Sequence, residues 1–266
     1  MIPEYTTVIG VDRRHLEQLA HTWPTWQKHK SSILSHPMIV FYDYQQVSEK
    51  EVREVVEHPH LTTVPWPYLP GAQFKGDGSS KWENPQRNKM LCGFIHVAAK
   101  HVRTPYWLKI DCDVVATGRD DWINPDWFVG KPAIVAHRWT FTKPPNQMDL
   151  LDQWVDDNQD ILIYFRDTKP LDLHPKSPES ERLSHKRIIS WCGLFQMDFT
   201  WLCAGASVAT CVPLNMPCPS QDGFMFYMAK RLGFSIMATN LKKLGWQHWS
   251  TMGNVIKYSQ QAMENE

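Results

Sequence analysis

The chain has 266 residues, of which 42% are hydrophobic and 21% are charged, and its 28 basic residues balance its 28 acidic ones. This composition is typical of a globular protein with a sizeable core, and it gives no sign of the broad positive surface of a nucleic-acid-binding protein. We expect no signal peptide, because the N-terminus lacks a charged stretch followed by an apolar one. We expect no transmembrane segment, because no apolar run reaches the roughly 18 residues that a membrane helix needs.

Six cysteines are spread along the chain without a Cys-x-x-Cys pair, a pattern that does not favour a zinc site. Several of them lie in apolar runs, where a free thiol behaves as a small hydrophobic side chain. We therefore expect reduced cysteines and a cytoplasmic protein.

Strands and helices alternate through the first half of the sequence. Apolar runs predict strands at residues 6–11, 38–43, 61–66 and 107–110. Between them, helices are predicted after residue 12, ending or kinking at Pro24, after the capping-box pair Ser48 and Glu51, and over residues 87–102. This alternation predicts an α/β fold with a Rossmann-like, mostly parallel central sheet flanked by helices.

The second half of the sequence is less regular. Strands are predicted at 132–137, at 187–198 running into a turn, and at 234–239, with a helix over 220–234. Residues 166–187 are rich in proline and charge and predict a mobile surface loop, which is either a lid or a plain excursion.

Carboxylates follow several of the predicted strands. Asp12 and Asp43 come at the ends of the first two, and Asp111 and Asp113 follow the apolar run at 107–110. The carboxyl ends of parallel strands meet at one edge of a sheet, where ligands bind. Because burying unpaired charge is costly, we expect an opposite charge beside Asp111 and Asp113. Mg²⁺ or Mn²⁺ would supply it and leave positions open for phosphates, unless one of the pair merely caps a turn.

At this point the sequence resembles a known family. The strand "WLKIDCDVV" after a helix that begins "RNKM" looks like the GT-A glycosyltransferases, whose Asp-x-Asp motif holds the metal of a nucleotide-sugar. The segment "SQDGFMFYMAKRLGF" resembles a helix of the large inverting family that includes cellulose synthase, with Gln221 where glutamate is common. The resemblance implies a single GT-A-like domain over 1–266, with a nucleotide-sugar-binding half (1–118), a less regular acceptor-binding half (119–250) and a C-terminal tail (251–266).

The resemblance also implies residues for the metal and for the chemistry. Asp113 would bind the metal directly, and Asp111 would share it or contact the ribose or sugar. His248 would be a third metal ligand, although a lone histidine is more often structural. Asp222 would be the general base that accepts the proton of the acceptor hydroxyl, unless it only complements a helix dipole.

Further residues are implied for the nucleotide and the sugar. Asp12 and Asp43 would hold the base and ribose, Arg87 or Lys89 would contact the nucleotide or its phosphates, Lys257 would meet the diphosphate, and Trp191 and Gly193 would form a floor beneath the donor sugar. Helix caps, turns and solvated helix faces are the plainer interpretations. Four tryptophans in polar or Gly/Pro-rich contexts are candidate platforms for sugars or bases: Trp66, Trp82, Trp246 and Trp249.

The leading interpretation is a Mn²⁺- or Mg²⁺-dependent glycosyltransferase. It would move a sugar from a nucleotide-sugar, with UDP as the expected nucleotide, to a hydroxyl acceptor with inversion. The acceptor is left open among a glycan, a lipid-linked sugar, a protein and a modified nucleic-acid base. One alternative is a sugar-nucleotide pyrophosphorylase, which normally has a glycine-rich phosphate loop that "VIGVDRRHL" lacks. The other is a non-catalytic nucleotide- or glycan-binding module, which the presence of Asp111, Asp113 and Asp222 together disfavours.

Overall fold

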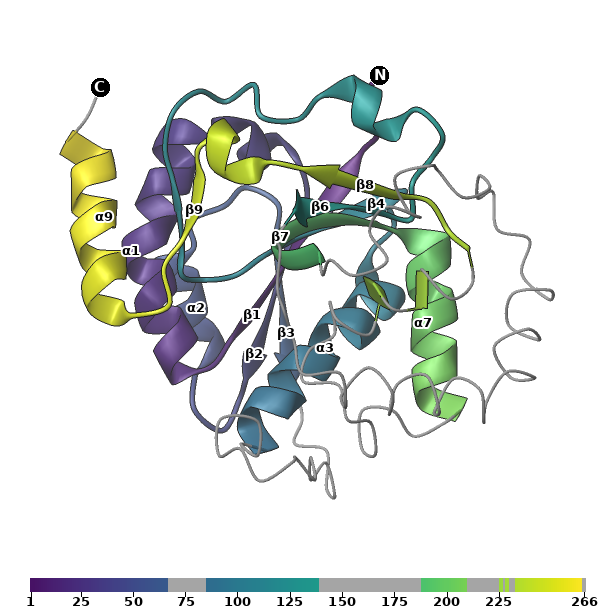
Figure 1. The fold of residues 1–266 in the computed structure, drawn as a ribbon. Coiled ribbons are helices and arrows are strands. Elements are labelled where there is room, and N and C mark those ends of the chain that lie inside the picture. The colour runs from purple at the N-terminus through teal and green to yellow at the C-terminus, as the bar shows by residue number, and fades with distance from the viewer. Residues whose placement is uncertain (67–84, 139–187, 210–224, 227, 230–232, 265–266) are drawn as a thin grey trace, which may run out of the picture.

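The computed structural model describes residues 1–66, 85–138, 188–209, 225–226, 228–229 and 233–264. Within these ranges, helices cover both faces of a central sheet, and a two-stranded sheet lies beside it (Figure 1). The loop predicted at 166–187, the base candidate Asp222 and the platform candidate Trp82 lie outside the described residues.

Among the described residues, seven strands form the central sheet, in the order β3-β2-β1-β4-β7-β6-β8. Their bounds are β1 (Tyr5–Val11), β2 (Met38–Asp43), β3 (Leu61–Trp66), β4 (Tyr106–Ile110), β6 (Ile134–Arg138), β7 (Ile188–Gln196) and β8 (Ile236–Thr239). Strands β3, β2, β1 and β4 are parallel, as are β6 and β8, whereas β7 runs antiparallel to β4 and β6. The predicted α/β fold with a mostly parallel sheet is therefore confirmed.

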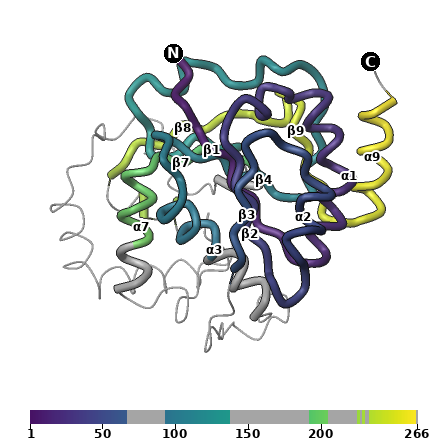
Figure 2. The backbone as a smooth tube through the Cα atoms, turned by 180° about the vertical axis from the view of Figure 1, so that it is seen from behind, coloured from purple at the N-terminus to yellow at the C-terminus, as the bar shows by residue number. Residues whose placement is uncertain are grey.

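Five helices flank this sheet in the described part of the chain: α1 (Arg13–His29), α2 (Glu49–Val55), α3 (Pro85–His101), α7 (Met197–Ala209) and α9 (Met252–Glu264). Helices α1, α2 and α9 lie on one side of the sheet and α3 and α7 on the other, as the views from front and back show (Figure 1, Figure 2). Short 3₁₀ turns lie at η1 (Ser31–Ser35), η2 (Pro125–Phe128) and η3 (Leu241–Leu244).

Three local predictions differ from these elements. Helix α1 continues through Pro24 to His29, because the packing of its apolar face outweighs the hydrogen bond that proline removes. The strand predicted to run into a turn at 187–198 instead gives way to helix α7 at Met197. Most of the segment predicted as a tail at 251–266 is helix α9, which packs against α1.

The two faces of the sheet carry separate apolar cores. In β4, Trp107 joins the core under α3 and α7, whereas Leu108 and Ile110 join the core under α1 and α2. Side chains alternate between the two faces of a strand, so Lys109 lies on the same face as Trp107. The Asp-x-Asp segment that follows β4 is thus reached by a strand that is buried on both faces.

The tryptophans predicted as platforms are mainly packing residues where the structure describes them. Trp246 is fully buried and packs edge-on against Trp26 and Trp122, so its prediction as a platform is wrong. Trp66 packs against Phe41. For Trp246, the polar context in the sequence did not predict exposure, because Trp26 and Trp122 cover its ring.

Two further findings bear on the class of protein. Cys112, Cys192 and Cys203 are buried free thiols. No helix among the described residues is long and apolar enough to span a bilayer.

Candidate metal centre

A tight turn and a small antiparallel sheet bring the candidate metal ligands together. Strand β4 ends at Ile110, the chain turns at Asp111–Asp113, and β5 (Val114–Ala116) follows. Strand β9 (Trp246–His248) pairs with β5 so that His248 lies opposite Val114. The backbone N–H of Trp249 donates to the carbonyl of Asp113 at 3.0 Å. This pairing places His248 beside the Asp-x-Asp turn.

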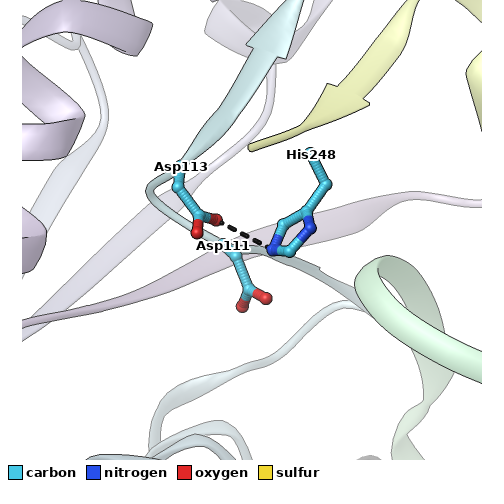
Figure 3. A group of neighbouring side chains, drawn as sticks. All are labelled: Asp111, Asp113 and His248. Carbon is cyan, nitrogen blue, oxygen red and sulfur yellow. Dashed lines mark ion pairs between the residues drawn. The ribbon is translucent and has the colours of Figure 1, made fainter. Parts of the chain in front are cut away.

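Asp111, Asp113 and His248 each offer one ligand atom, and these atoms all lie within 4.8 Å of one another (Figure 3). Asp113 Oδ1 is buried and accepts no well-aligned hydrogen bond in the described part of the chain, although His248 Nε2 lies 3.3 Å away. Carboxylate oxygens suit Mg²⁺ and Mn²⁺, and imidazole is a common metal ligand. A buried, unsatisfied carboxylate oxygen in such a group fits a divalent cation.

The electrostatics of His248 follow from the two carboxylates. Burial lowers the pKa of its imidazole, but the contact with Asp113 and the charge of Asp111 outweigh burial and raise that pKa above its usual value. The protein therefore holds a proton on His248 to a higher pH than a free histidine would. A metal ligand must lose that proton, so cation binding and protonation compete at this side chain.

Asp111 has a cationic partner in the strand that precedes it. Lys109 Nζ lies 2.5 Å from Asp111 Oδ1, and the lysine side chain is only 3% exposed. Burial and the charge of Asp113 raise the pKa of Asp111, despite the opposing charges of Lys109 and His248. The opposite charge expected beside the carboxylates is therefore partly supplied by the chain itself. Sequence reasoning missed Lys109, which lies in β4 two residues before Asp111.

Asp12 caps helix α1 at the end of β1. Its Oδ1 accepts a hydrogen bond from the backbone N–H of His15 at 2.9 Å and lies 2.7 Å from His15 Nδ1. Burial raises the pKa of Asp12, but the hydrogen bonds and charge of His15 outweigh burial and lower it. The charges of Asp12, Asp111 and Asp113 raise the pKa of His15 against the effect of burial. The helix-cap interpretation thus holds, and a contact of Asp12 with a nucleotide stays a prediction.

Asp43 closes the turn that follows β2. Its carboxylate accepts from the backbone N–H of Gln45 at 3.1 Å and from Gln46 Nε2 at 2.8 Å, and the residue is fully buried. These contacts are those of a turn residue, so its predicted contact with base or ribose stays a prediction.

The remaining candidates lie on helices α3 and α9 and on strand β7. Gly193 is buried in β7, opposite Lys109. Lys257 is exposed on α9, and its Nζ lies 5.2 Å from the ring of Tyr258, which stacks on Trp249 at 3.7 Å. Arg87 and Lys89 lie on α3 and Trp191 on β7, but their side chains are outside the described part. The roles predicted for all of them stay predictions.

Comparisons with known proteins show the fold. No family model and no curated protein sequence matches the chain. Core-mannan synthase A from Aspergillus fumigatus, solved in its Mn/GDP form, is 11% identical with a TM-score of 0.57, over 89% of this chain and 73% of that one. The mannosyltransferase Ktr4p from S. cerevisiae in complex with GDP is 11% identical with a TM-score of 0.51, over 89% and 67%.

A third similar structure comes from a different kind of enzyme. The 4-diphosphocytidyl-2C-methyl-D-erythritol synthase from Anaerococcus prevotii DSM 20548 is 10% identical with a TM-score of 0.53, over 98% of this chain and 99% of that one. At such identities the likeness concerns the fold alone. The finer resemblance to the family that includes cellulose synthase is not among these findings. The chain has an α/β fold similar to that of GT-A glycosyltransferases, with a group of possible metal ligands at the end of β4.

Proposed function

We propose that the chain is a metal-dependent glycosyltransferase that uses a nucleotide-sugar donor. The observation that carries the proposal is the group Asp111, Asp113 and His248, which lies where β4 ends in the parallel part of the sheet. Ligands of open α/β sheets bind at this edge. The likeness of the fold to a mannan synthase solved with manganese and GDP supports the same interpretation.

Each residue of the centre has a distinct part in this proposal. Asp113 and His248 would hold a divalent cation, because Asp113 Oδ1 is buried and accepts no well-aligned hydrogen bond among the described residues. Asp111 would only share the cation, because Lys109 already contacts its Oδ1. When bound, the cation supplies positive charge for the diphosphate that leaves the sugar. Asp222, carried over from the family resemblance, would accept the proton of the acceptor hydroxyl.

The donor, the acceptor and the stereochemistry are finer parts of the proposal. UDP is the nucleotide that the family resemblance implies, and GDP is named for two structures of similar fold. Inversion follows from the role of Asp222 and stays a prediction with it. A cytoplasmic location likewise stays a prediction.

A second candidate function follows from the diphosphocytidyl-methylerythritol synthase, whose fold matches the chain nearly from end to end. An enzyme that makes a nucleotide-linked product from a nucleoside triphosphate would share the sheet and the metal requirement. The start of α1 disfavours it for this chain. Val11 ends β1 and Arg13 already begins α1, so no glycine-rich phosphate loop lies between them.

A binding and turnover series tests the proposal. Melting curves with UDP, GDP, CDP and ADP, each with and without Mn²⁺, should show stabilisation only when one diphosphate and the metal are both present. At a hundredfold the dissociation constant, the expected gain is about 2.7 kcal/mol. The nucleotide that binds then selects the nucleotide-sugars for an assay of slow, Mn²⁺-dependent release of free sugar.

The outcomes separate the candidate functions. Release of free sugar from a nucleotide-sugar supports a glycosyltransferase. Release of pyrophosphate from a nucleoside triphosphate and a sugar phosphate would instead support the synthase-like alternative. Binding without either reaction, across the whole set of sugars, would support a non-catalytic binding module.

A further inference from the structure

A buried lysine lies directly against the candidate metal centre. Lys109 is the last residue but one of β4, its side chain is 3% exposed, and its Nζ lies 2.5 Å from Asp111 Oδ1. The ammonium group also lies 5.1 Å from the ring of Phe94 on α3. The residue opposite it in β7 is Gly193. The aliphatic part of the Lys109 side chain is buried, which holds the ammonium group beside the carboxylates.

This charge changes what a cation meets at the centre. With a neutral His248, Asp111 and Asp113 carry two negative charges, and the ammonium of Lys109 cancels one of them. A divalent cation that binds Asp111 and Asp113 must come close to the ammonium, and charges of like sign repel strongly in a partly buried site. The carboxylate oxygen that Lys109 engages is also less available as a ligand.

A diphosphate reverses this balance. Its negative charges would offset the ammonium as well as the metal, and its oxygens would fill positions that the protein leaves open. We propose that Lys109 is a built-in competitor of the metal: it weakens the binding of a free divalent cation and makes that binding depend on the nucleotide diphosphate. The inference rests on the proposed function and deepens it, because it gives the order in which the ligands assemble.

The test is the affinity of the nucleotide-free protein for Mn²⁺ alone. Electron paramagnetic resonance at fixed pH follows the signal of free aqueous manganese, which falls as the ion binds. Replacing Lys109→Met removes the charge and keeps the buried stem, so Mn²⁺ should bind at least about tenfold more tightly than to the wild type. Saturating UDP or GDP should strengthen Mn²⁺ binding to the wild type much more than to the variant.

Matched variants separate charge from structure. Lys109→Arg keeps the positive charge and should bind free Mn²⁺ as weakly as the wild type. Lys50→Met removes a lysine that is 85% exposed on α2 and should leave Mn²⁺ affinity unchanged. If Lys109→Met fails to fold by circular dichroism, Lys109→Gln offers a neutral polar side chain and should show the same gain.

The result that overturns the inference is unchanged or weaker binding of free Mn²⁺ in the folded neutral variants. Removing a merely structural lysine would leave the Mn²⁺ affinity unchanged or lower it, whereas removing a competing charge raises the Mn²⁺ affinity. Failure of the proposed function looks different. If Lys109→Met gains Mn²⁺ affinity but neither protein releases sugar from any nucleotide-sugar, the role of Lys109 stands and the glycosyltransferase proposal falls.

Discussion

His248 Nε2 lies 3.3 Å from Asp113 Oδ1, although the two residues come from opposite halves of the sequence. The antiparallel pair of β5 and β9 holds them in register, with His248 opposite the residue that follows Asp113. The contact gives a buried carboxylate a neighbour that can carry a positive charge. In the proposed site, a proton and a metal ion compete for His248, and the first two predictions concern the two residues of this contact.

Replacing Asp113→Asn should abolish Mn²⁺-dependent binding of a nucleoside diphosphate. The amide keeps the size of the side chain but removes the charge of the buried ligand oxygen. Isothermal titration of the nucleotide in Mn²⁺ is the measurement, alongside a melting curve without metal, which should change little. Asp126→Asn changes an exposed acid in η2 and serves as the control. Unchanged nucleotide affinity in the Asp113 variant would remove Asp113 from the metal site.

Replacing His248→Ala should weaken Mn²⁺ binding by about tenfold to a hundredfold, because the proposed site then loses one of its candidate ligands. In the wild type, Mn²⁺ affinity should fall as the pH drops through the raised pKa of His248, since the proton then occupies the ligand atom. That pH dependence should flatten in the variant. His21→Ala, which removes an exposed histidine of α1, should reproduce neither effect.

The pair of Asp12 and His15 should stabilise the metal-free protein in a defined pH window. The pKa of Asp12 is lowered, so its share is present above the usual carboxyl pKa and is lost as the pH falls through the folded value. The pKa of His15 is raised, so its share is complete below about 6.5 and is lost as the pH rises through the folded value.

Replacing Asp12→Asn keeps the helix cap and removes the charge. Since the His15 side chain is 39% exposed, solvent screens the pair, and the variant should lose only about 0.5 kcal/mol at pH 5.5. The difference from wild type should shrink towards pH 9, where His15 has lost its charge. Urea unfolding in EDTA at both pH values measures it, and an equal loss at pH 9 would contradict an ionic contribution.

Two glycines make room for the buried ring of Phe41. A Cβ at Gly10 in β1 would lie 2.4 Å from Phe41 Cζ, and one at Gly93 in α3 would lie 2.5 Å from Phe41 Cε2. Gly10→Ala should therefore destabilise the protein by about 1–3 kcal/mol through overpacking. Phe41→Leu should recover part of the loss in the double variant, as urea unfolding can show.

Gly253 provides the matched control for this substitution. It lies in α9, and a Cβ there meets no atom within 4 Å. Gly253→Ala should raise the stability by about 0.5–1 kcal/mol, because alanine favours a helix more than glycine does. A similar loss at Gly10 and Gly253 would argue against a steric effect of Phe41.

Replacing Asp222→Asn should lower turnover far more than donor affinity. Asparagine has nearly the same shape but does not accept the acceptor's proton, so the chemical step should slow by about a hundredfold or more. Single-turnover transfer at saturating donor is the measurement, with a melting curve beside it. Wild-type turnover would exclude Asp222 as the base and, with it, the argument for inversion. A lowered melting temperature at normal turnover would make the residue structural.

Much of the fold follows from local patterns in the sequence. Apolar runs and helical spacing predict β1, β2 and β3 nearly at their observed bounds and the starts of α1 and α2, because each element must bury an apolar face whatever its partners are. The Asp-x-Asp segment is also visible locally, since it directly follows a run that is too apolar to be exposed. By these means the sequence alone determined the α/β class and the edge of the sheet at which the carboxylates lie.

The partners of those carboxylates were decided by tertiary structure. His248 reaches Asp113 only because β9 pairs with β5, and a pairing between distant segments leaves no periodic mark in the sequence. Trp246, in the same strand, was predicted as an exposed platform and is buried, because Trp26 of α1 and Trp122 cover it. Lys109 looked like an ordinary strand residue until the fold buried it beside Asp111. The charge balance of the metal centre depends on burial and distance, and those are properties of the folded chain.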